Sequence, residues 1–383
     1  MNVDHDEIIR RATEIAPKLA LNASECEAAR RVHPDSIRLM VEAGLFRILQ
    51  PSRVHGYELS LETFADTVTI LSEACASSGW VLGVVGAHHW CMGAFPEAAQ
   101  EEIFGDNRDA FIAGTLSWQG NATPVDGGYR VTGRWQFGSG VDHSNWVMLG
   151  CANPETHAPL VHVVVPRTDI EIDDTWQVMG MRGTGSKDVV AREVFVPAHR
   201  TIDTRTFFIG KSPHVTNHST NLYRLPAEAI LGVLGPTSLL GIAKSALRTF
   251  TERTRERRVI VTGTRKSEYV PTQMRLAEAA GEVKCADLLI HDGLRECDRI
   301  MADGSHTSEQ RTRIKWQGAY ATELCRRAAG RLFAGSGAHT IYNESEMQVA
   351  FRNINVAANH ASLDFDISAE QYGRELLGVK RSP

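Results

Sequence analysis

The sequence predicts an α+β protein in which two helical regions flank one region of strands. Before residue 109, apolar residues recur at helical spacing, as at Ile37, Met40 and Val41. Between residues 109 and 212, short β-forming runs alternate with turn residues, and from residue 213 long amphipathic patterns return. These changes predict an N-terminal helical domain over 1–108, a central β-barrel or sandwich domain over 109–212, and a C-terminal four-helix bundle over 213–383.

The N-terminal region has helical patterns and no strand pattern. The stretches HPDSIRLMVEAGLFRILQP and LSLETFADTVTILSEACASS each predict a helix, and FPEAAQEEIFG predicts a short one between Pro96 and Gly105. The longest apolar stretch, Gly79–Phe95, falls short of the roughly 20 residues that a membrane span needs. It therefore predicts a buried helix.

The central region predicts six to eight strands. In GGYRVTGRWQFGSG, a Gly-Gly turn precedes Tyr129 and Val131, which alternate with polar residues. The other β-rich runs are DAFIAGTLS, NWVMLGCA, LVHVVVP, IEIDDTWQVMG and DVVAREVFVP. After this region, three long helical patterns begin near residues 226, 271 and 307, and two shorter ones follow. They predict an antiparallel bundle.

Composition narrows the class of protein. The net charge is −5 over 383 residues, so nothing favours binding to nucleic acid or to an anionic membrane. The seven cysteines form no CxxC pair, which predicts reduced thiols rather than disulfides or a metal site. The N-terminus has acidic residues and no apolar core of a signal peptide. We expect a cytoplasmic protein with no metal.

The stretch MGMRGTGSKDVV, residues 179–190, contains three glycines and a lysine. A P-loop needs Gly-Lys-Ser/Thr at the start of a helix, whereas here Ser186 precedes Lys187 and β-forming residues follow. A Rossmann turn needs a βαβ unit, which the region lacks. Two interpretations remain: a polar turn between strands, which the motif alone favours, or a loop whose N–H groups and hydroxyls meet a polar cofactor.

Two longer stretches, TWQVMGMRGTGSKDVVAREVFVPAHR and GGYRVTGRWQFGSGVDHSNWVMLG, resemble the acyl-CoA dehydrogenase superfamily. Within it they resemble the oxygenase components of two-component flavin-dependent monooxygenases that hydroxylate aromatic compounds. The resemblance covers nearly the whole chain, because the order of the three regions is also that of the superfamily. It implies an acyl-CoA dehydrogenase-like fold and a homotetramer. It also implies reduced flavin, FMNH2 or FADH2, supplied by a separate reductase, with dioxygen and a small aromatic compound as substrates.

The resemblance assigns residues to the flavin ring. Phe137 and Ser139 fall where the superfamily places an aromatic side chain and a hydroxyl against it, and Trp176 falls where the monooxygenase branch places a tryptophan. The other residues implied at the flavin are Thr115 and Ser117 on the first strand and Thr184 and Ser186 in the glycine-rich stretch. For each, the alternative is a core aromatic or a local hydroxyl in a turn.

Basic residues are implied at the flavin phosphate. RTRERR ends the first bundle helix, and Arg258 or Arg257 falls where the superfamily uses an arginine. Arg331 and Gly335 fall in a glycine-rich turn, with Gly337, that reaches the flavin of a neighbouring subunit. A solvated basic helix end is an equally good interpretation of any one arginine.

The catalytic glutamate of acyl-CoA dehydrogenases is missing from FRNINVAANHASLDFD. His360 stands beside the corresponding position, and the monooxygenase branch uses a histidine there. Histidine titrates near neutral pH, so it can take a phenolic proton. Of His88 and His89, which interrupt an apolar helix, His88 is expected to face the active site. The alternative for His360 is a buried histidine that caps a helix end, but the missing glutamate favours the catalytic role. Asp142–His143 is a further candidate pair, for which a strand-end turn is the simpler interpretation.

The sequence thus predicts a monooxygenase that forms a C4a-hydroperoxyflavin and hydroxylates a phenolic or indole-like ring, with His360 as base and with His88 and Ser139 assisting. An acyl-CoA dehydrogenase or oxidase is the alternative, and it would need a base such as Asp364, Asp366 or Glu370. N- or S-oxygenation on the same fold is a further alternative. A third hypothesis, from outside the enzymes, is a binding or scaffold protein that has this fold but binds no flavin.

Overall fold

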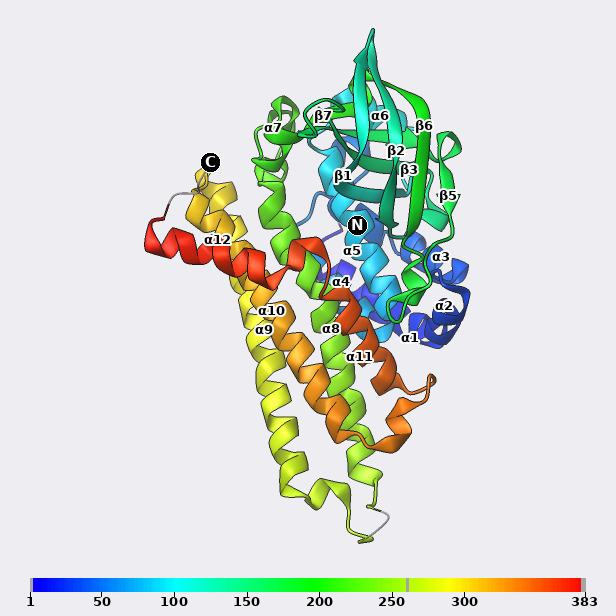
Figure 1. Ribbon diagram of the computed structural model, residues 1–383, viewed down its shortest axis with the longest axis vertical. Helices are drawn as coiled ribbons and strands as arrows, with labels where there is room; N and C mark the ends of the chain where they lie inside the picture. The colour runs from blue at the N-terminus through cyan, green and yellow to red at the C-terminus, as the bar shows by residue number, and fades with distance from the viewer. Residues whose placement is uncertain (1–2, 260–261, 380–383) are drawn as a thin grey trace.

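The computed structural model describes residues 3–259 and 262–379, and it confirms the α+β, acyl-CoA dehydrogenase-like fold (Figure 1). Within these ranges the helices α1 to α6 precede the strands, and the long helices α8 to α10 follow them. The sheet lies at one end of the molecule, and the long helices extend away from it toward the opposite end (Figure 1). Helix α5 of the first region packs against α8 of the third region, and this contact joins the two helical regions.

The N-terminal helices begin where polar side chains satisfy free backbone N–H groups. The Asp4 carboxylate accepts from Glu7 N at 3.0 Å, and Ser60 Oγ accepts from Thr63 N at 3.1 Å. Almost all of the apolar stretch 79–95 is buried, as its composition predicts. The helices are α1 (His5–Leu21), α2 (Ala23–Ala29), α3 (Pro34–Glu42), α4 (Leu61–Ala74), α5 (Ala76–Met92) and α6 (Glu97–Phe104).

The strands form one mixed seven-stranded sheet in the order β5-β6-β2-β1-β3-β4-β7. The β1–β3 pair is parallel and the other pairs are antiparallel. β1 is longer than the sequence run suggests, because it continues into a tight hairpin with β2, and a bulge follows Thr115. The strands are β1 (Ile112–Val125), β2 (Gly128–Gly138), β3 (Trp146–Ala152), β4 (Pro159–Pro166), β5 (Glu171–Asp173), β6 (Lys187–Pro197) and β7 (Thr201–Asp203).

After the short α7 (Thr204–Phe208), the chain forms the bundle of α8 (Ala227–Glu256), α9 (Val270–Asp303), α10 (Ser308–Gly335) and α11 (Glu346–Ala357). A capping box between Thr307 and Gln310 starts α10. A one-turn helix, η11 (Ala361–Leu363), connects α11 to α12 (Phe365–Leu377). Of the described helices, α8 alone has the length and composition to cross a membrane, but 72% of its most apolar window is buried inside the protein. It therefore packs as a core helix.

Candidate active site

Three hydroxyl groups meet at the ends of β2 and β6. Ser139 Oγ lies 2.7 Å from Ser186 Oγ, which lies 2.6 Å from Thr184 Oγ1. All three side chains are buried. We call these residues the hydroxyl cluster. It joins the GRWQFGSG strand to the glycine-rich stretch, so two motifs that are 40 residues or more apart in the sequence form one site.

The glycine-rich stretch is a tight loop that packs on the N-terminal helices. Arg182–Thr184 form a one-turn helix, η5, and Gly185 follows in the left-handed region at φ 56°. A Cβ at Gly183 would lie 2.7 Å from Ser77 Oγ and 2.8 Å from Cys26 Cβ. Gly183 therefore allows the loop to approach α2 and α5 closely. We call residues 179–187 the flavin loop, after the role that the sequence predicts for it.

The lysine of this loop has a structural partner. Lys187 Nζ lies 2.9 Å from a carboxylate oxygen of Asp142, and both side chains are largely buried. His143, the neighbour of Asp142, has its Nε2 at 3.0 Å from the Val32 carbonyl oxygen. The pair Asp142–His143 thus fastens the loop and the β2 end to the N-terminal region, as a strand-end turn does.

Helix α11 also holds the flavin loop. Asn353 Oδ1 accepts from Met181 N at 2.6 Å, and Arg352 donates to the Met179 carbonyl oxygen. These bonds connect the loop to the helix that leads directly to His360.

Phe137 and Trp176 present aromatic rings beside the hydroxyl cluster. Their ring centroids are 6.2 Å apart in an edge-to-face arrangement. Trp176 is buried and its Nε1 donates to the Met181 carbonyl oxygen at 3.1 Å. Phe137 has φ 69° and is 56% exposed, an unusual combination for a bulky apolar residue. A strained, exposed ring next to buried hydroxyls suits a flat aromatic ligand with polar edges.

Trp80 on α5 links the hydroxyl cluster to His360. Its Nε1 donates to Ser139 Oγ at 3.2 Å, and its ring meets the His360 ring edge-on at 5.6 Å between centroids. The sequence does not identify Trp80 as a site residue, because a tryptophan in an apolar helix is usually a core residue. Its partial exposure and its indole bond to a predicted site residue identify it here.

His360 stands at the start of η11 and is accessible to solvent. Enough protein surrounds the ring that desolvation lowers the pKa of His360 below its ordinary value. Its Nδ1 lies 2.8 Å from Ser362 Oγ. The imidazole is therefore neutral at pH 7, and its position is set by contacts with Ser362 and Trp80.

Thr115 and Ser117 lie on β1 near the hydroxyl cluster but outside its hydrogen bonds. Gly114, the residue before Thr115, forms a β-bridge with Ser139. Thr115 Oγ1 accepts from Ser117 N at 3.3 Å, and the Ser117 side chain is exposed. Both residues belong to the bulged part of β1.

His88 and His89 on α5 both contact backbone carbonyl oxygens. His88 Nδ1 lies 2.9 Å from the Ile112 carbonyl oxygen, and His89 Nδ1 lies 2.8 Å from that of Phe46. Both rings are buried, and desolvation lowers the pKa of His88 to about 4 and that of His89 to about 3. Trp80, not His88, forms the aromatic contact from α5 to His360. A role for His88 at the active site stays a prediction.

The predicted phosphate-binding arginines separate into two groups. Arg257 donates to the Ser336 carbonyl oxygen and Lys266 to that of Gly335, beside Arg253 in a small pocket. We call these three cations and their surroundings the basic pocket; its lining residues are Phe250, Arg253, Thr254, Arg257, Lys266, Gly335 and Ser336. Desolvation, Arg257 and Arg275 lower the pKa of Lys266. A bound anion would relieve this crowding of positive charge.

Arg258 and Arg331 lie outside the basic pocket. Arg258 is exposed and donates to the Gly263 carbonyl oxygen at 2.8 Å. Arg331 forms ion pairs with Glu278 and with Glu282, the latter at 3.0 Å. The guanidinium of Arg331 is thus already neutralised by two glutamates of α9. No sequence pattern predicts this contact, because it joins two separate helices.

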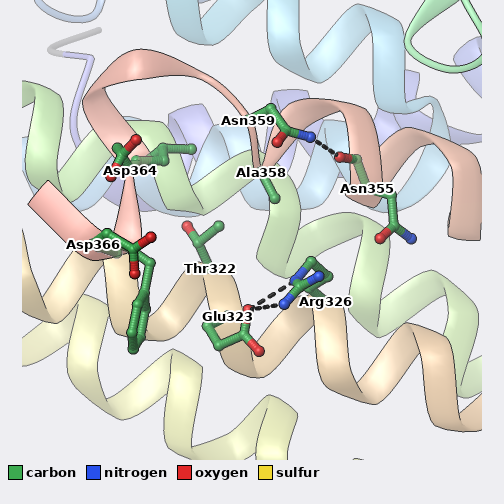
Figure 2. Close-up of a pocket in the computed structure, with 11 residues that line it drawn as sticks. Thr322, Glu323, Arg326, Asn355, Ala358, Asn359, Asp364 and Asp366 are labelled. Atoms are coloured by element: carbon green, nitrogen blue, oxygen red, sulfur yellow. Dashed lines mark hydrogen bonds and ion pairs between the residues drawn. The ribbon is translucent and has the colours of Figure 1, made fainter.

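A cavity of about 310 Å³ lies between α10, α11, η11 and α12. Figure 2 shows Asp364 and Asp366 on one side of it and Glu323, paired with Arg326, on the other. Its lining does not include Trp80, His360 or the hydroxyl cluster. The three carboxylates that could serve as the base of a dehydrogenase are occupied outside the hydroxyl cluster. Asp364 and Asp366 line this cavity, where Asp364 also caps α12, and Glu370 pairs with Arg374 at 2.7 Å.

Among the described residues, metal-ligating side chains approach one another at Glu62, Asp66 and His291, whose ligand atoms lie within 4.8 Å. His291 Nε2 is 3.4 Å from Asp66 Oδ1. Asp66 raises the pKa of His291 to about 9, so at pH 7 the group is an ion pair.

Comparisons with known proteins agree with this architecture. Residues 236–365 match the family "Acyl-CoA dehydrogenase, C-terminal domain". The flavin-dependent monooxygenase oxygenase subunit HsaA of Rhodococcus jostii is 30% identical over 97% of this chain and 98% of its own. The oxygenase component of p-hydroxyphenylacetate 3-hydroxylase from Acinetobacter baumannii is also 30% identical, over 98% and 90%. XiaF from a Streptomyces species, solved with FADH2 and glycerol, superposes with a TM-score of 0.91 at 27% identity over 99% and 97%.

The fold and the relatives define the class of protein. The chain belongs to the acyl-CoA dehydrogenase superfamily, in the branch of oxygenase components of flavin-dependent monooxygenases. It is an oxidoreductase that uses reduced flavin from a separate reductase.

Proposed function

We propose that this enzyme hydroxylates a small phenolic or indole-like substrate with dioxygen and reduced flavin, and that His360 is the base. The observation that carries the proposal is one continuous series of contacts. It runs from His360 through Trp80 to Ser139 and the hydroxyl cluster. The relative from Acinetobacter baumannii is by its name a hydroxylase of p-hydroxyphenylacetate, a phenol.

The residues at the ends of β2 and β6 fit a flavin ring. Phe137 offers an exposed aromatic face. The hydroxyl protons of the cluster are used in a chain from Ser139 through Ser186 and Thr184 to the Met181 carbonyl oxygen, so the cluster offers buried lone pairs that can accept from N–H groups at the polar edge of the ring. When bound, the reduced flavin activates dioxygen, and we propose the C4a-hydroperoxide as the oxygenating form. Ser139 and Ser186 hold the ring edge, Trp176 borders it, and burial of these groups keeps water from the reacting atoms.

His360 acts on the substrate hydroxyl or N–H group. His360 Nδ1 lies 2.8 Å from Ser362 Oγ and caps η11 by accepting from Ser362 N at 3.3 Å, so in the free enzyme the ring proton is on Nε2. We propose that substrate binding selects the other tautomer, in which Nδ1 donates to Ser362 Oγ and Nε2 has a free lone pair. Nε2 then accepts the phenolic proton, and the negative charge on oxygen raises the electron density at the ring carbon that is hydroxylated. Trp80 fixes the plane of the imidazole through its edge-on contact. His88 lies about two turns further along α5, where its contact with the Ile112 carbonyl oxygen holds α5 against β1.

The basic pocket supports assembly into a homotetramer. It lies at the α8–α9 turn, at the end of the bundle farthest from the sheet (Figure 1). We propose that Arg257 and the turn at Gly335 bind the phosphate end of a flavin held by a neighbouring chain. In this proposal Arg258 and Arg331 do not bind the phosphate themselves; they stabilise the conformation of the segments around the pocket.

The test is a single-turnover reaction of His360→Ala. A panel of phenols and indole identifies a compound that the wild-type enzyme hydroxylates. Loss of the base is expected to lower the hydroxylation rate by roughly a hundred- to ten-thousand-fold. Flavin oxidation should continue, with its oxygen released as hydrogen peroxide. His199→Asn, an exposed histidine paired with Glu102, is the matched control. Unchanged hydroxylation by His360→Ala would overturn the assignment.

A further inference from the structure

The cavity beside the segment that carries His360 has no part in the proposed hydroxylation. It lies between α10, α11, η11 and α12, and its volume of about 310 Å³ is in the range of small-molecule sites. Its lining includes Asn359, the residue before His360, and Leu363 of η11, which follows it. A ligand in this cavity would therefore contact the chain on both sides of His360.

Thr322 on α10 brings an unpaired hydroxyl group to this cavity. The residue is only 3% exposed, and its Oγ1 has no hydrogen-bond partner among the described residues. Figure 2 shows its side chain pointing into the cavity beside Asp366. In contrast, the hydroxyls of Thr251 and Thr312 donate to the carbonyl oxygen one helical turn earlier, at 2.8 and 3.0 Å. A buried hydroxyl without a partner costs free energy, which a ligand that bonds to it would recover.

The free polar atoms of the lining are mostly hydrogen-bond acceptors. Asp364 uses Oδ1 to cap α12, and Glu323 uses Oε2 to bind Arg326. Within the described residues, the second oxygen of each carboxylate accepts no hydrogen bond. Asn355 and Asn359 each donate from Nδ2 to a backbone carbonyl oxygen, at 2.8 and 2.6 Å, so their Oδ1 atoms are available. The lining therefore suits a ligand that is rich in N–H donors.

The lining also carries a net negative charge, because the carboxylates of Glu323, Asp364 and Asp366 share it with one guanidinium, that of Arg326. Acidic residues are favourable at a helix N-terminus, which accounts for Asp364 and Asp366 at the start of α12. It does not account for Glu323 in the interior of α10, or for the unpaired hydroxyl of Thr322. The cavity thus favours a cation.

The positions of the carboxylates indicate the length of that cation. Asp364 and Asp366 lie on one side of the cavity and Glu323 on the other (Figure 2). They do not converge on one point, since within the described residues three metal-ligating side chains come together only in the α4–α9 cluster that contains His291. A single metal ion would not reach both sides. An aliphatic chain with an ammonium group at each end would, and its methylene groups would lie on apolar side chains such as Leu363.

We propose that this cavity binds a small aliphatic diamine. Aliphatic amines titrate at about 10, as lysine does, so both ends are ammonium groups at pH 7. One ammonium group donates to Asp366 and to Thr322 Oγ1, and the other donates to the free oxygen of Glu323. The bound diamine holds together α10, η11 and the start of α12, and with them the segment on which His360 stands.

The test is isothermal titration calorimetry of the enzyme with 1,5-diaminopentane, in the absence of flavin and substrate. The salt concentration is about 0.15 M, so that attraction between exposed charges is screened. Binding is expected with a Kd below about 1 mM. The neutral analogue 1,5-pentanediol, which has the same chain length, should not bind. Because the experiment needs no catalysis, its outcome does not depend on whether the enzyme hydroxylates phenols.

Three variants remove polar groups of the cavity one at a time. Asp366→Asn and Glu323→Gln should each weaken the Kd about ten-fold, because each loses a charged hydrogen bond. Thr322→Val keeps the shape of the side chain without its hydroxyl and should weaken the Kd several-fold. The matched control is Glu370→Gln, which removes the same charge from α12 outside the lining and should bind like the unmodified enzyme. Circular dichroism checks that each variant is folded.

Three results would overturn the proposal. No binding of 1,5-diaminopentane up to about 10 mM would show that the cavity is not a diamine site. Equal binding of 1,5-pentanediol would show that the carboxylates do not recognise the ligand. Equal losses in Asp366→Asn and Glu370→Gln would mean that the diamine is attracted by the charge of α12 in general and not by this cavity.

Discussion

The hydroxyl cluster and the basic pocket differ in how their residues come together. The hydroxyl cluster joins β2, β6 and α5 within one chain, and its members hydrogen-bond directly to each other or to Trp80. The basic pocket gathers cations of α8 and the segment after it beside the end of α10, and none of its lining residues belongs to the hydroxyl cluster. The hydroxyl cluster is thus formed by contacts within one chain, whereas the phosphate-binding role proposed for the basic pocket involves a neighbouring chain.

The largest expected change in affinity for reduced flavin distinguishes Arg257 from Arg258. If Arg257 binds the flavin phosphate, Arg257→Ala loses a charged hydrogen bond of about 1.5–3 kcal/mol, which corresponds to a roughly ten- to hundred-fold weaker Kd for reduced flavin. Arg258→Ala, at the exposed neighbouring position, should bind almost normally. Fluorescence titration under anaerobic conditions measures both. Equal losses would remove the distinction between the basic pocket and the exposed helix end.

The close approach of the flavin loop to α2 and α5 can be broken at Gly183. Its Cβ would collide with Cys26 and Ser77, so Gly183→Ala should lower the free energy of unfolding by about 1–3 kcal/mol and weaken flavin binding. The control is Gly281→Ala on α9, where a Cβ meets nothing within 4 Å. That variant should be neutral or slightly more stable. Urea denaturation of both variants decides the point, and equal stability of the two would contradict the packing described here.

The cooperation within the hydroxyl cluster can be sharpened by a double-mutant cycle. Ser139→Ala, Ser186→Ala and the double variant should show a coupling of about 1 kcal/mol in the affinity for reduced flavin, because the two hydroxyls share one hydrogen bond. Additive effects would mean that each serine acts alone.

A smaller effect is expected at Ser362. The pKa of His360 is lowered by desolvation, so the free base persists below the ordinary histidine pKa, and hydroxylation should fall only as pH drops through that lowered value. Ser362→Ala removes the hydroxyl contact at His360 Nδ1 and should lower kcat a few-fold with little change in KM. Ser362→Thr keeps a hydroxyl and should restore kcat. The pH profile of hydroxylation in the three enzymes is the measurement, and identical profiles and kcat values would exclude a positioning role.

The sequence predicted the fold, and it pointed to several residues that the structure brings together in the candidate site. The residues that it did not place correctly have physical explanations. Motif order and resemblance identified Phe137, Ser139, Thr184 and Ser186, which the structure brings together, since each lies at a strand end fixed by local pairing. The sequence did not identify Trp80 as a site residue, because only the tertiary packing of α5 brings its indole to Ser139.

Contacts between helices far apart in the sequence explain the other differences. Arg331 meets Glu282 of α9, and His88 meets β1, neither of which a pattern in the sequence reveals. The choice between Arg257 and Arg258 depends on the residue at which α8 ends, Glu256, and helix ends are the least predictable feature of a helix.

The most direct test of the central claim is a stopped-flow experiment that mixes the enzyme and reduced flavin with dioxygen. A long-lived C4a-hydroperoxide absorbance is expected in the absence of substrate, because the hydroxyl cluster and Trp176 are buried and exclude water. With a phenolic substrate the absorbance should decay faster and yield the hydroxylated product. Direct conversion to oxidised flavin, with no intermediate and no product, would contradict the assignment of this site to oxygenation.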